Sequence, residues 1–252
     1  MSLTGQHAIV TGGGTGTGAA IALALAHAGA KVTVMGRREA PLREVAGQHR
    51  FVGYVTCDVT DPVALRAAFA QARGLNGTVD IVVANAGAAN SVPFRKATAE
   101  DFQSMLDVNL KGVFNSFQAG LGDMEQAGGG RLIAIASTAG LKGYPYVSGY
   151  CAAKHGVVGL VRALALELAR SGVTVNAVCP GFIETPLLDR SIANIVDKTG
   201  MSPEDAAKSL RRSNPQGRFI QPDEVAQTVL WLCSDAARSV NGHALSVSGG
   251  EI

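Results

Sequence analysis

Short apolar runs alternate along the chain with longer segments of helical periodicity. Two of these runs, Ile81-Val82-Val83 and Leu132-Ile133-Ala134-Ile135, contain no polar residue, which is typical of parallel strands covered by helices on both faces. The pattern predicts seven strands, at His7–Thr11, Lys31–Met35, Phe51–Thr56, Val79–Ala84, Arg131–Ala136, Val173–Val178 and Ala244–Val247.

The segments between the strands carry helix start and stop signals. Start signals stand at Asp61-Pro62, at Thr98 with Asp101, and at Pro222-Asp223-Glu224. Gly29 stands where a C′ glycine would end a helix over Gly18–Ala28. This alternation predicts an α/β fold: a doubly wound (Rossmann) seven-stranded parallel sheet with helices on both faces. Because no repeat or linker divides the sequence, residues 1–252 are expected to form a single domain.

Residues 181–221 form a long excursion from this alternation. Short helices are predicted within it near Leu188–Val196 and Pro203–Ser213. Because long excursions inside a compact domain are usually lids or binding loops, we expect this segment to be a lid over a substrate site.

Composition excludes several classes of protein. The 252 residues are 47% hydrophobic and carry a net charge of +2, which excludes a disordered chain and a strongly basic nucleic-acid-binding protein. The four cysteines form no CxxC pair, so neither a disulfide framework nor a metal site is expected. No targeting segment is visible at the N-terminus, and the longest apolar run, Ala19–Ala26, is too short to span a membrane. A cytoplasmic protein with no membrane or nucleic-acid partner is therefore expected.

A glycine-rich turn follows the first predicted strand. It reads Thr11-Gly12-Gly13-Gly14-Thr15-Gly16-Thr17-Gly18 and leads directly into a helix. Free backbone N–H groups and the positive end of the helix dipole would face an anion here, and glycine would let the backbone approach a pyrophosphate. No Lys-Ser/Thr pair follows the turn, which excludes a nucleoside-triphosphate P-loop. The turn therefore predicts a dinucleotide cofactor.

The end of the second strand indicates which dinucleotide is bound. NAD-binding chains usually place Asp or Glu about 20 residues beyond the turn, where the carboxylate accepts hydrogen bonds from the ribose 2′-hydroxyl. Here Gly36 is followed by Arg37 and Arg38. Two guanidinium groups, with no carboxylate to repel a phosphate, favour NADP(H). NAD(H) is the alternative if the arginines only cap a surface turn.

Ser137, Tyr150 and Lys154 are candidates for the chemistry. The spacing Tyr-x-x-x-Lys places both side chains on one face of a helix, although such a pair is often an ordinary helix-surface pair. A lysine ammonium and a cofactor cation would each favour the phenolate by roughly 4 kcal/mol, for a separation of about 4 Å and an effective dielectric of about 20. Tyr150 could then exchange a proton with a carbonyl oxygen that Ser137 holds by a hydrogen bond.

Over essentially its whole length the sequence resembles the short-chain dehydrogenase/reductase family. The motifs that carry the resemblance are, in order, Thr11-Gly12-x-x-x-Gly16-x-Gly18, Asp58-Val59, Asn85-Ala86-Gly87, Asn109, Ser137, Tyr150-x-x-x-Lys154, Pro180-Gly181 and Thr185. The resemblance implies an oxidoreductase that uses a nicotinamide cofactor to interconvert a ketone and a secondary alcohol. It also implies a homodimer or homotetramer, formed through the helices that hold Asn109–Gly120 and Cys151–Arg170.

The resemblance further implies roles for individual residues. Asn109, Ser137, Tyr150 and Lys154 would be catalytic, with Asn109 holding a water that links the lysine to solvent. The residues that would bind the cofactor are Gly12, Thr15, Gly16, Thr17, Gly18, Arg37, Arg38, Asp58, Val59, Asn85, Ala86, Gly87, Tyr150, Lys154, Pro180, Gly181, Ile183 and Thr185. The chain departs from the family pattern at Ala84, where Asn is common. It departs again at Thr15, where NADP-binding members often have a basic residue, so the NADP(H) prediction rests on the two arginines.

Within the family, the nearest resemblance is to ketoreductases of aromatic polyketide pathways and to 3-oxoacyl reductases. It is carried by Ala136–Gly140, Cys151–Gly159 and Val178–Pro186. A 3-oxoacyl thioester or a polyketide-like ketone is therefore expected, with a free small or cyclic ketone as the alternative. A non-catalytic dinucleotide sensor is least favoured, because Tyr150 and Lys154 are both present. The acidic stretch Gly122–Gly128 predicts that an acidic acyl carrier protein would be repelled.

Overall fold

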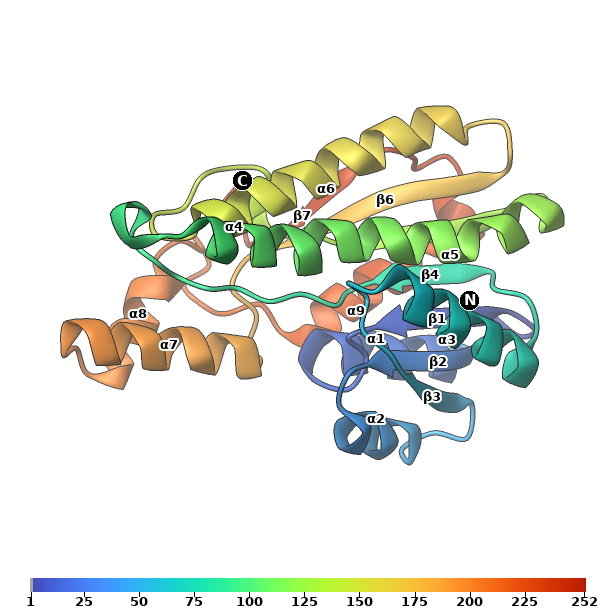
Figure 1. Cartoon of the computed structure of the whole chain (residues 1–252), viewed down its shortest axis with the longest axis horizontal. Coiled ribbons are helices and arrows are strands. Elements are labelled where there is room, and N and C mark those ends of the chain that lie inside the picture. The colour runs from blue at the N-terminus through green and yellow to red at the C-terminus, as the bar shows by residue number, and fades with distance from the viewer. Residues whose placement is uncertain (1) are drawn as a thin grey trace.

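The computed structural model describes residues 2–252 and contains a seven-stranded parallel sheet in the order β3-β2-β1-β4-β5-β6-β7 (Figure 1). The strands are β1 (His7–Thr11), β2 (Lys31–Gly36), β3 (Val52–Thr56), β4 (Ile81–Ala84), β5 (Gly130–Ile135), β6 (Val173–Pro180) and β7 (Ala244–Val247). The predicted doubly wound sheet is confirmed. Because the strand order reverses between β1 and β4, a crevice is expected at the carboxyl ends of these two strands.

The strand boundaries differ from the predicted ones at a few ends only. β6 continues past the predicted end at Val178, because Cys179 and Pro180 pair with Ser246 and Val247 of β7. This extension carries Pro180 to the edge of the sheet where the crevice lies.

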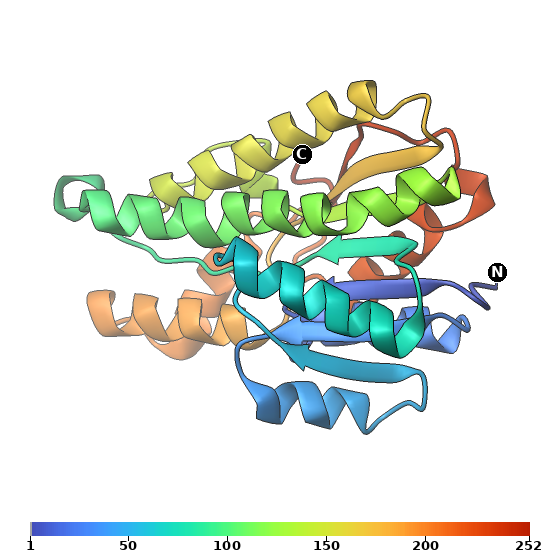
Figure 2. The same ribbon diagram turned by 45° about the vertical axis from the view of Figure 1, so that its right-hand side comes forward.

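Helices cover both faces of the sheet (Figures 1 and 2). One face is covered by α1 (Gly16–His27), α2 (Glu39–Ala46) and α9 (Pro222–Leu232), and the other by α3 (Pro62–Asn76), α5 (Gly112–Ala127) and α6 (Ser148–Glu167). Three short 3-10 turns connect these elements, η1 (Phe94–Lys96), η3 (Thr138–Gly140) and η4 (Asp235–Ala237). No helix within residues 2–252 combines the length and the apolar character needed to cross a membrane.

The predicted helix start signals are confirmed by the capping contacts. The Asp61 carboxylate accepts hydrogen bonds from the backbone N–H groups of Val63 and Ala64 at the start of α3. Thr98 and Asp101 form a capping box at the start of α4 (Ala99–Leu106). The first helix begins at Gly16 rather than at the predicted Gly18, so the end of the glycine-rich turn is itself helical.

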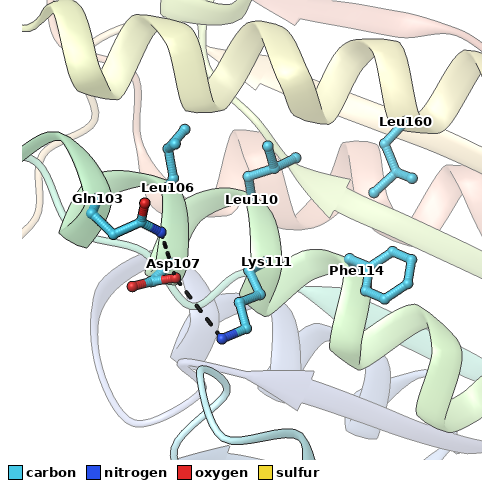
Figure 3. Close-up of a pocket in the computed structure, with 7 residues that line it drawn as sticks. All are labelled: Gln103, Leu106, Asp107, Leu110, Lys111, Phe114 and Leu160. Carbon is cyan, nitrogen blue, oxygen red and sulfur yellow. Dashed lines mark hydrogen bonds and ion pairs between the residues drawn. The ribbon is translucent and has the colours of Figure 1, made fainter.

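α4 and α5 form one long helix. They are joined by a π-helical turn, η2 (Asp107–Lys111), and together lie beside α6. A shallow apolar groove of about 300 Å³ runs between this long helix and α6, and Figure 3 shows the residues that line it. The apolar lining residues are Leu106, Leu110, Phe114 and Leu160. Asp107 and Lys111 lie at its polar side, with 3.9 Å between their charged atoms.

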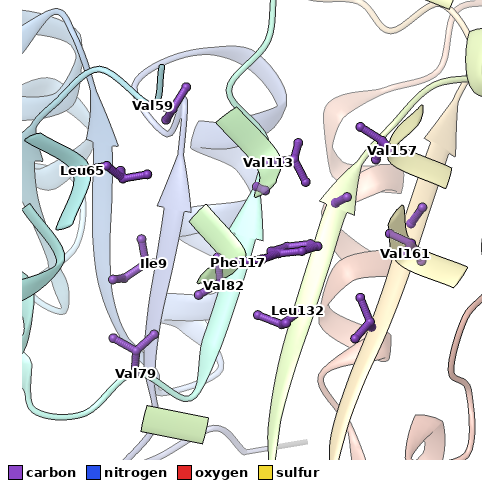
Figure 4. Packing of buried hydrophobic residues seen from close by; sticks show 14 of the residues in the cluster. Ile9, Val59, Leu65, Val79, Val82, Val113, Phe117, Leu132, Val157 and Val161 are labelled. Atoms are coloured by element: carbon purple, nitrogen blue, oxygen red, sulfur yellow. The ribbon is translucent and has the colours of Figure 1, made fainter. Parts of the chain in front are cut away.

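Alternate residues of the strands enter two separate hydrophobic clusters. Ile9 of β1 faces the α3–α5–α6 side, whereas its neighbours Ala8 and Val10 face the α1–α9 side. Phe117 of α5 lies at the centre of the first cluster, near Val82 of the sheet (Figure 4). Because all of these side chains are buried, water is excluded from both faces of the sheet. The close packing also holds the ends of the strands in fixed positions.

Residues 181–221 form two helices, close to the predicted ones. They are α7 (Pro186–Thr199) and α8 (Pro203–Arg211), which project beyond the carboxyl ends of the strands (Figure 1). A bridge between Ile183 and Ile220 joins the two ends of the segment. Lys198 Nζ of α7 donates a hydrogen bond of 3.1 Å to the Ser91 carbonyl oxygen, so α7 contacts the segment that follows β4.

The acidic stretch Gly122–Gly128 lies away from the crevice. The Asp123 carboxylate is 14% exposed and binds Arg73, with 2.7 Å between Oδ2 and Nε. It also accepts a hydrogen bond from the backbone N–H of Val79, ahead of β4, and so lies at the amino edge of the sheet. The stretch is therefore partly neutralised and lies at the edge of the sheet opposite the crevice, so it does not support the expected repulsion of a carrier protein, which stays a prediction.

Candidate active site

The glycine-rich turn between β1 and α1 is shaped to hold an anion. Gly12 has a φ of 65°, and a Cβ at this position would lie 2.8 Å from the Cα of Ala86, so only glycine fits. Asn85 Nδ2 donates hydrogen bonds to the carbonyl oxygens of Thr11 (3.0 Å) and Gly12 (3.2 Å), which fixes the turn against the end of β4. Thr15, at the N-cap of α1, makes no capping bond within the described chain. The first N–H groups of α1 are therefore open to a phosphate.

The ends of β2 and β3 lie side by side and place opposite charges together. Arg37 and Arg38 are exposed, and Arg37 Nη1 lies 4.0 Å from Asp58 Oδ2. Partial burial opposes ionisation of Asp58, but hydrogen bonds from Thr60 and the charge of Arg37 outweigh it, so the pKa of this carboxyl lies below its usual value. No carboxylate stands at the end of β2 itself, as expected, but Asp58 from the end of β3 places one beside Arg37.

Ser137, Tyr150 and Lys154 come together where β5 ends beside the first turns of α6. Lys154 is 4% exposed, and its Nζ donates a hydrogen bond of 2.8 Å to the carbonyl oxygen of Ile135. The same Nζ lies 5.6 Å from the centre of the Tyr150 ring. Ser137 Oγ accepts a hydrogen bond of 3.0 Å from the backbone N–H of Ala139, which leaves its hydroxyl proton free to be donated.

Burial shifts the pKa values of both the tyrosine and the lysine. Burial raises the pKa of Tyr150 to about 12, and the nearby Ser137 opposes this only in part. Burial lowers the pKa of Lys154 to about 8. Burial thus opposes the lowering of the tyrosine pKa that was expected from the lysine ammonium together with a cofactor cation, and that lowering stays a prediction for the cofactor-bound site.

Asn109 is fully buried in the π-helical turn between α4 and α5. Its Nδ2 donates to the Ala88 carbonyl oxygen (2.8 Å), and its Oδ1 accepts from the Ala88 N–H (3.2 Å), so the side chain pairs with the backbone that follows β4. Gly87 lies between Asn109 and Lys154: a Cβ on it would be 2.8 Å from Asn109 Oδ1 and 3.8 Å from Lys154 Nζ. Because Gly87 has no side chain, Asn109 Oδ1 and Lys154 Nζ can lie close to each other across it.

The end of β6 brings the remaining predicted residues to the turn. Pro180 ends the strand, and Gly181 and Ile183 lead to Thr185 at the N-cap of α7. A Cβ on Gly16 would lie 3.1 Å from Thr185 Cγ2, so the N-termini of α1 and α7 face the same space. Gly16, Thr17 and Gly18 form the first helical turn of α1.

Two residues differ from their expected placement. The Val59 side chain is buried against Gly112 in the core, so only its backbone is available near the crevice. Thr11, which begins the glycine-rich motif but was given no role of its own, accepts hydrogen bonds at its Oγ1 from the N–H groups of Asn85 (3.1 Å) and Ala86 (3.2 Å). A buried threonine at the end of a parallel strand was the available signal for this contact.

Comparison with known proteins agrees with this architecture. Residues 12–251 match the family described as enoyl-(acyl carrier protein) reductase. The chain is 41% identical to a protein of Streptomyces violaceoruber named as ketoacyl reductase 1 of the granaticin polyketide synthase, over 96% of this chain and 92% of the relative. It is 36% identical to D-beta-hydroxybutyrate dehydrogenase of Cupriavidus necator, over 98% of both chains. Among solved structures, a variant of the actinorhodin polyketide ketoreductase with NADPH superposes with a TM-score of 0.95 at 37% identity, covering 100% of this chain and 99% of the other.

The fold and the site define a nucleotide-dependent oxidoreductase of the doubly wound class. The chain belongs to the short-chain dehydrogenase/reductase family, whose members act on alcohol and ketone groups with a nicotinamide cofactor. The resemblance seen in the sequence and the predicted class of enzyme are both confirmed.

Proposed function

We propose that this protein is an NADPH-dependent ketoreductase in which Tyr150 exchanges the proton and Ser137 holds the carbonyl oxygen. The observation that carries the proposal is the placement of Tyr150 and a buried Lys154 on one face of α6, next to Ser137 at the end of β5. Burying a lysine ammonium is costly, and this one lies beside the hydroxyl groups of Tyr150 and Ser137, which suit proton transfer to a carbonyl.

The residues at the crevice fit a dinucleotide. The open N–H groups of α1 and the side-chain-free turn at Gly12 suit a pyrophosphate, and Arg37 would bind a 2′-phosphate. Lys154 would bond the ribose hydroxyls, while Ile183 and Thr185 would hold the carboxamide. When bound, the cofactor supplies or accepts the hydride.

The proton follows a separate route through the side chains. A neutral Tyr150 donates its phenolic proton to the carbonyl oxygen during ketone reduction, while the free hydroxyl proton of Ser137 holds that oxygen in place. Lys154 then returns a proton to the phenolate. Its pKa of about 8 lets it take up a new proton near neutral pH, along the path beside Gly87 and Asn109.

The substrate proposal is a 3-oxoacyl thioester or a polyketide-like ketone, supported by the names of the granaticin and actinorhodin relatives. A free small or cyclic ketone is the second candidate, supported by the hydroxybutyrate dehydrogenase relative. Residues 181–221 would act as the lid over this substrate, because α7 begins at the N-cap that faces the glycine turn and reaches Ser91.

The test is the oxidation of NADPH by purified protein with acetoacetyl-coenzyme A, acetoacetate and 1-tetralone as ketones. Tyr150→Phe should lower the turnover of the best ketone by at least about 100-fold, since acid–base groups typically contribute about 10²–10⁴-fold. NADPH affinity should stay within about twofold, because the ring is kept. A Tyr150→Phe variant with more than about a tenth of the wild-type rate would refute the assignment.

The apolar groove on α4, α5 and α6 suggests a homodimer or homotetramer. Phe114 in the groove is 46% exposed, and Leu166, further along α6, is 82% exposed. Exposed apolar side chains in and near such a groove favour association with another copy. We also infer a cytoplasmic location, since all four cysteines are free and three of them are buried.

A further inference from the structure

The segment that follows β7 returns to the candidate site. The backbone N–H of Gly181 donates a hydrogen bond of 3.0 Å to the carbonyl oxygen of Val247. This contact places Glu251 beside the end of β6, and its side chain is 1% exposed. A buried carboxylate thus lies next to the segment proposed to hold the nicotinamide.

One oxygen of Glu251 holds the loop between Ser137 and Tyr150. Oε1 accepts a hydrogen bond from Tyr144 Oη (2.5 Å) and forms an ion pair with Lys142 Nζ (2.8 Å). The Tyr144 hydroxyl oxygen also lies 2.7 Å from Oγ1 of Thr138, the residue next to Ser137. Burial and the Glu251 carboxylate raise the pKa of the Tyr144 phenol above its usual range, so Tyr144 stays a neutral donor.

The other oxygen of Glu251 has no hydrogen-bond partner among the described residues. A Cβ on Gly181 would lie 3.3 Å from Oε2, so this oxygen faces the backbone at the end of β6. An unpaired buried acceptor is destabilising, and a smaller side chain at this position would avoid that cost. We therefore attribute the presence of a carboxylate at this position to its contacts with Tyr144 and Lys142, and not to a gain in stability.

The group that Glu251 holds is an aromatic pair. The Tyr144 ring meets the Phe182 ring edge to face, with 6.2 Å between the centroids and 84° between the planes. Phe182 directly follows Gly181, and Tyr144 belongs to the loop that joins Ser137 to Tyr150. The two rings therefore join the loop between Ser137 and Tyr150 to the segment proposed to hold the nicotinamide.

We propose that Glu251 is a positioning residue that holds Tyr144 against Phe182, and that the two rings form a wall of the ketone pocket which favours flat, cyclic ketones. This inference rests on the proposed ketone site at Ser137 and Tyr150. The rigid rings offer contact area to a planar substrate at low entropic cost, whereas a linear 3-oxoacyl chain gains less from them.

Kinetics of Glu251→Ala and Glu251→Gln test the proposal, with Glu125→Ala as the matched control because Glu125 is exposed at the end of α5. Glu251→Ala should raise the KM for 1-tetralone about tenfold with kcat within about threefold, and should raise the KM for acetoacetyl-coenzyme A less than threefold. Glu251→Gln should stay close to wild type, because its amide oxygen still accepts the Tyr144 proton. Equal losses in both variants, or equal effects on both ketones, would overturn the proposal.

Limited trypsin digestion in the presence of NADPH gives a readout that needs no turnover. Cleavage after Lys142 should be about tenfold faster in Glu251→Ala than in wild type and less than about threefold faster in Glu251→Gln, because the amide loses the charge of the Lys142 ion pair but keeps the Tyr144 contact that holds the loop. Unchanged cleavage in Glu251→Ala would show that Glu251 does not hold Tyr144. A Tyr150→Phe variant that keeps its activity would refute the proposed ketone site. The digestion result does not depend on that site, because it reports only whether Glu251 holds the loop.

Discussion

Replacing Arg37 by alanine should reveal which dinucleotide the protein prefers. Arg37 extends from the end of β2 with its side chain 77% exposed and one guanidinium nitrogen 4.0 Å from Asp58. A hydrogen bond to a charged group is worth about 1.5–3 kcal/mol, and exposure to solvent moves this one to the lower part of the range. Alanine would also leave the Asp58 carboxylate facing the 2′-phosphate. We therefore expect NADPH affinity to fall about 10- to 50-fold.

The assay is a fluorescence titration of NADPH and of NADH into wild type, Arg37→Ala and Asp58→Asn. NADH lacks the 2′-phosphate, so its affinity for Arg37→Ala should stay within about twofold of wild type. Asp58→Asn removes the negative charge and should tighten NADPH relative to NADH. Equal weakening of both cofactors by Arg37→Ala would refute this reasoning and return NAD(H) as the preferred cofactor.

Two further predictions concern the fold and the assembly. Asp61→Ala removes the side-chain cap of α3 and should lower the free energy of unfolding by about 1 kcal/mol in urea titrations; an unchanged midpoint would mean that solvent caps the helix equally well. Phe114→Asp places a charge in the apolar groove and should shift the protein towards a monomer in light scattering after gel filtration. An unchanged molar mass of the variant would mean that the interface between copies lies on another face.

Much of the fold could be predicted from the sequence because its signals are local. The two fully apolar runs became β4 and β5 of a sheet covered on both faces, and the cap at Asp61 was read from two adjacent residues. The glycine turn could be predicted for the same reason, since a strand, a turn and a helix start follow one another directly.

The contacts that could not be predicted join distant parts of the chain. Arg37 meets Asp58 only because β2 and β3 are neighbours, and Tyr144 meets Glu251 across 107 positions of sequence. The π-helical turn that buries Asn109 could not be predicted from the sequence either, because one widened turn hardly changes the helical periodicity of the apolar residues. Burial is also a property of the whole fold, which is why its effect on the pKa of Tyr150 could not be predicted from the sequence.

The raised pKa of Tyr150 favours ketone reduction over alcohol oxidation near neutral pH. Ketone reduction needs a protonated Tyr150, and a phenol of pKa about 12 is protonated throughout the neutral range. The logarithm of kcat/KM for reduction should therefore be flat up to about pH 8, and should fall above it as Lys154 loses its charge. Alcohol oxidation needs the phenolate instead, so its kcat/KM should rise with pH across the same range. The check is a pair of pH–rate profiles, for a ketone with NADPH and for the matching alcohol with NADP. An oxidation profile that reaches its plateau below pH about 7 would show that the charges in the working site lower the tyrosine pKa after all.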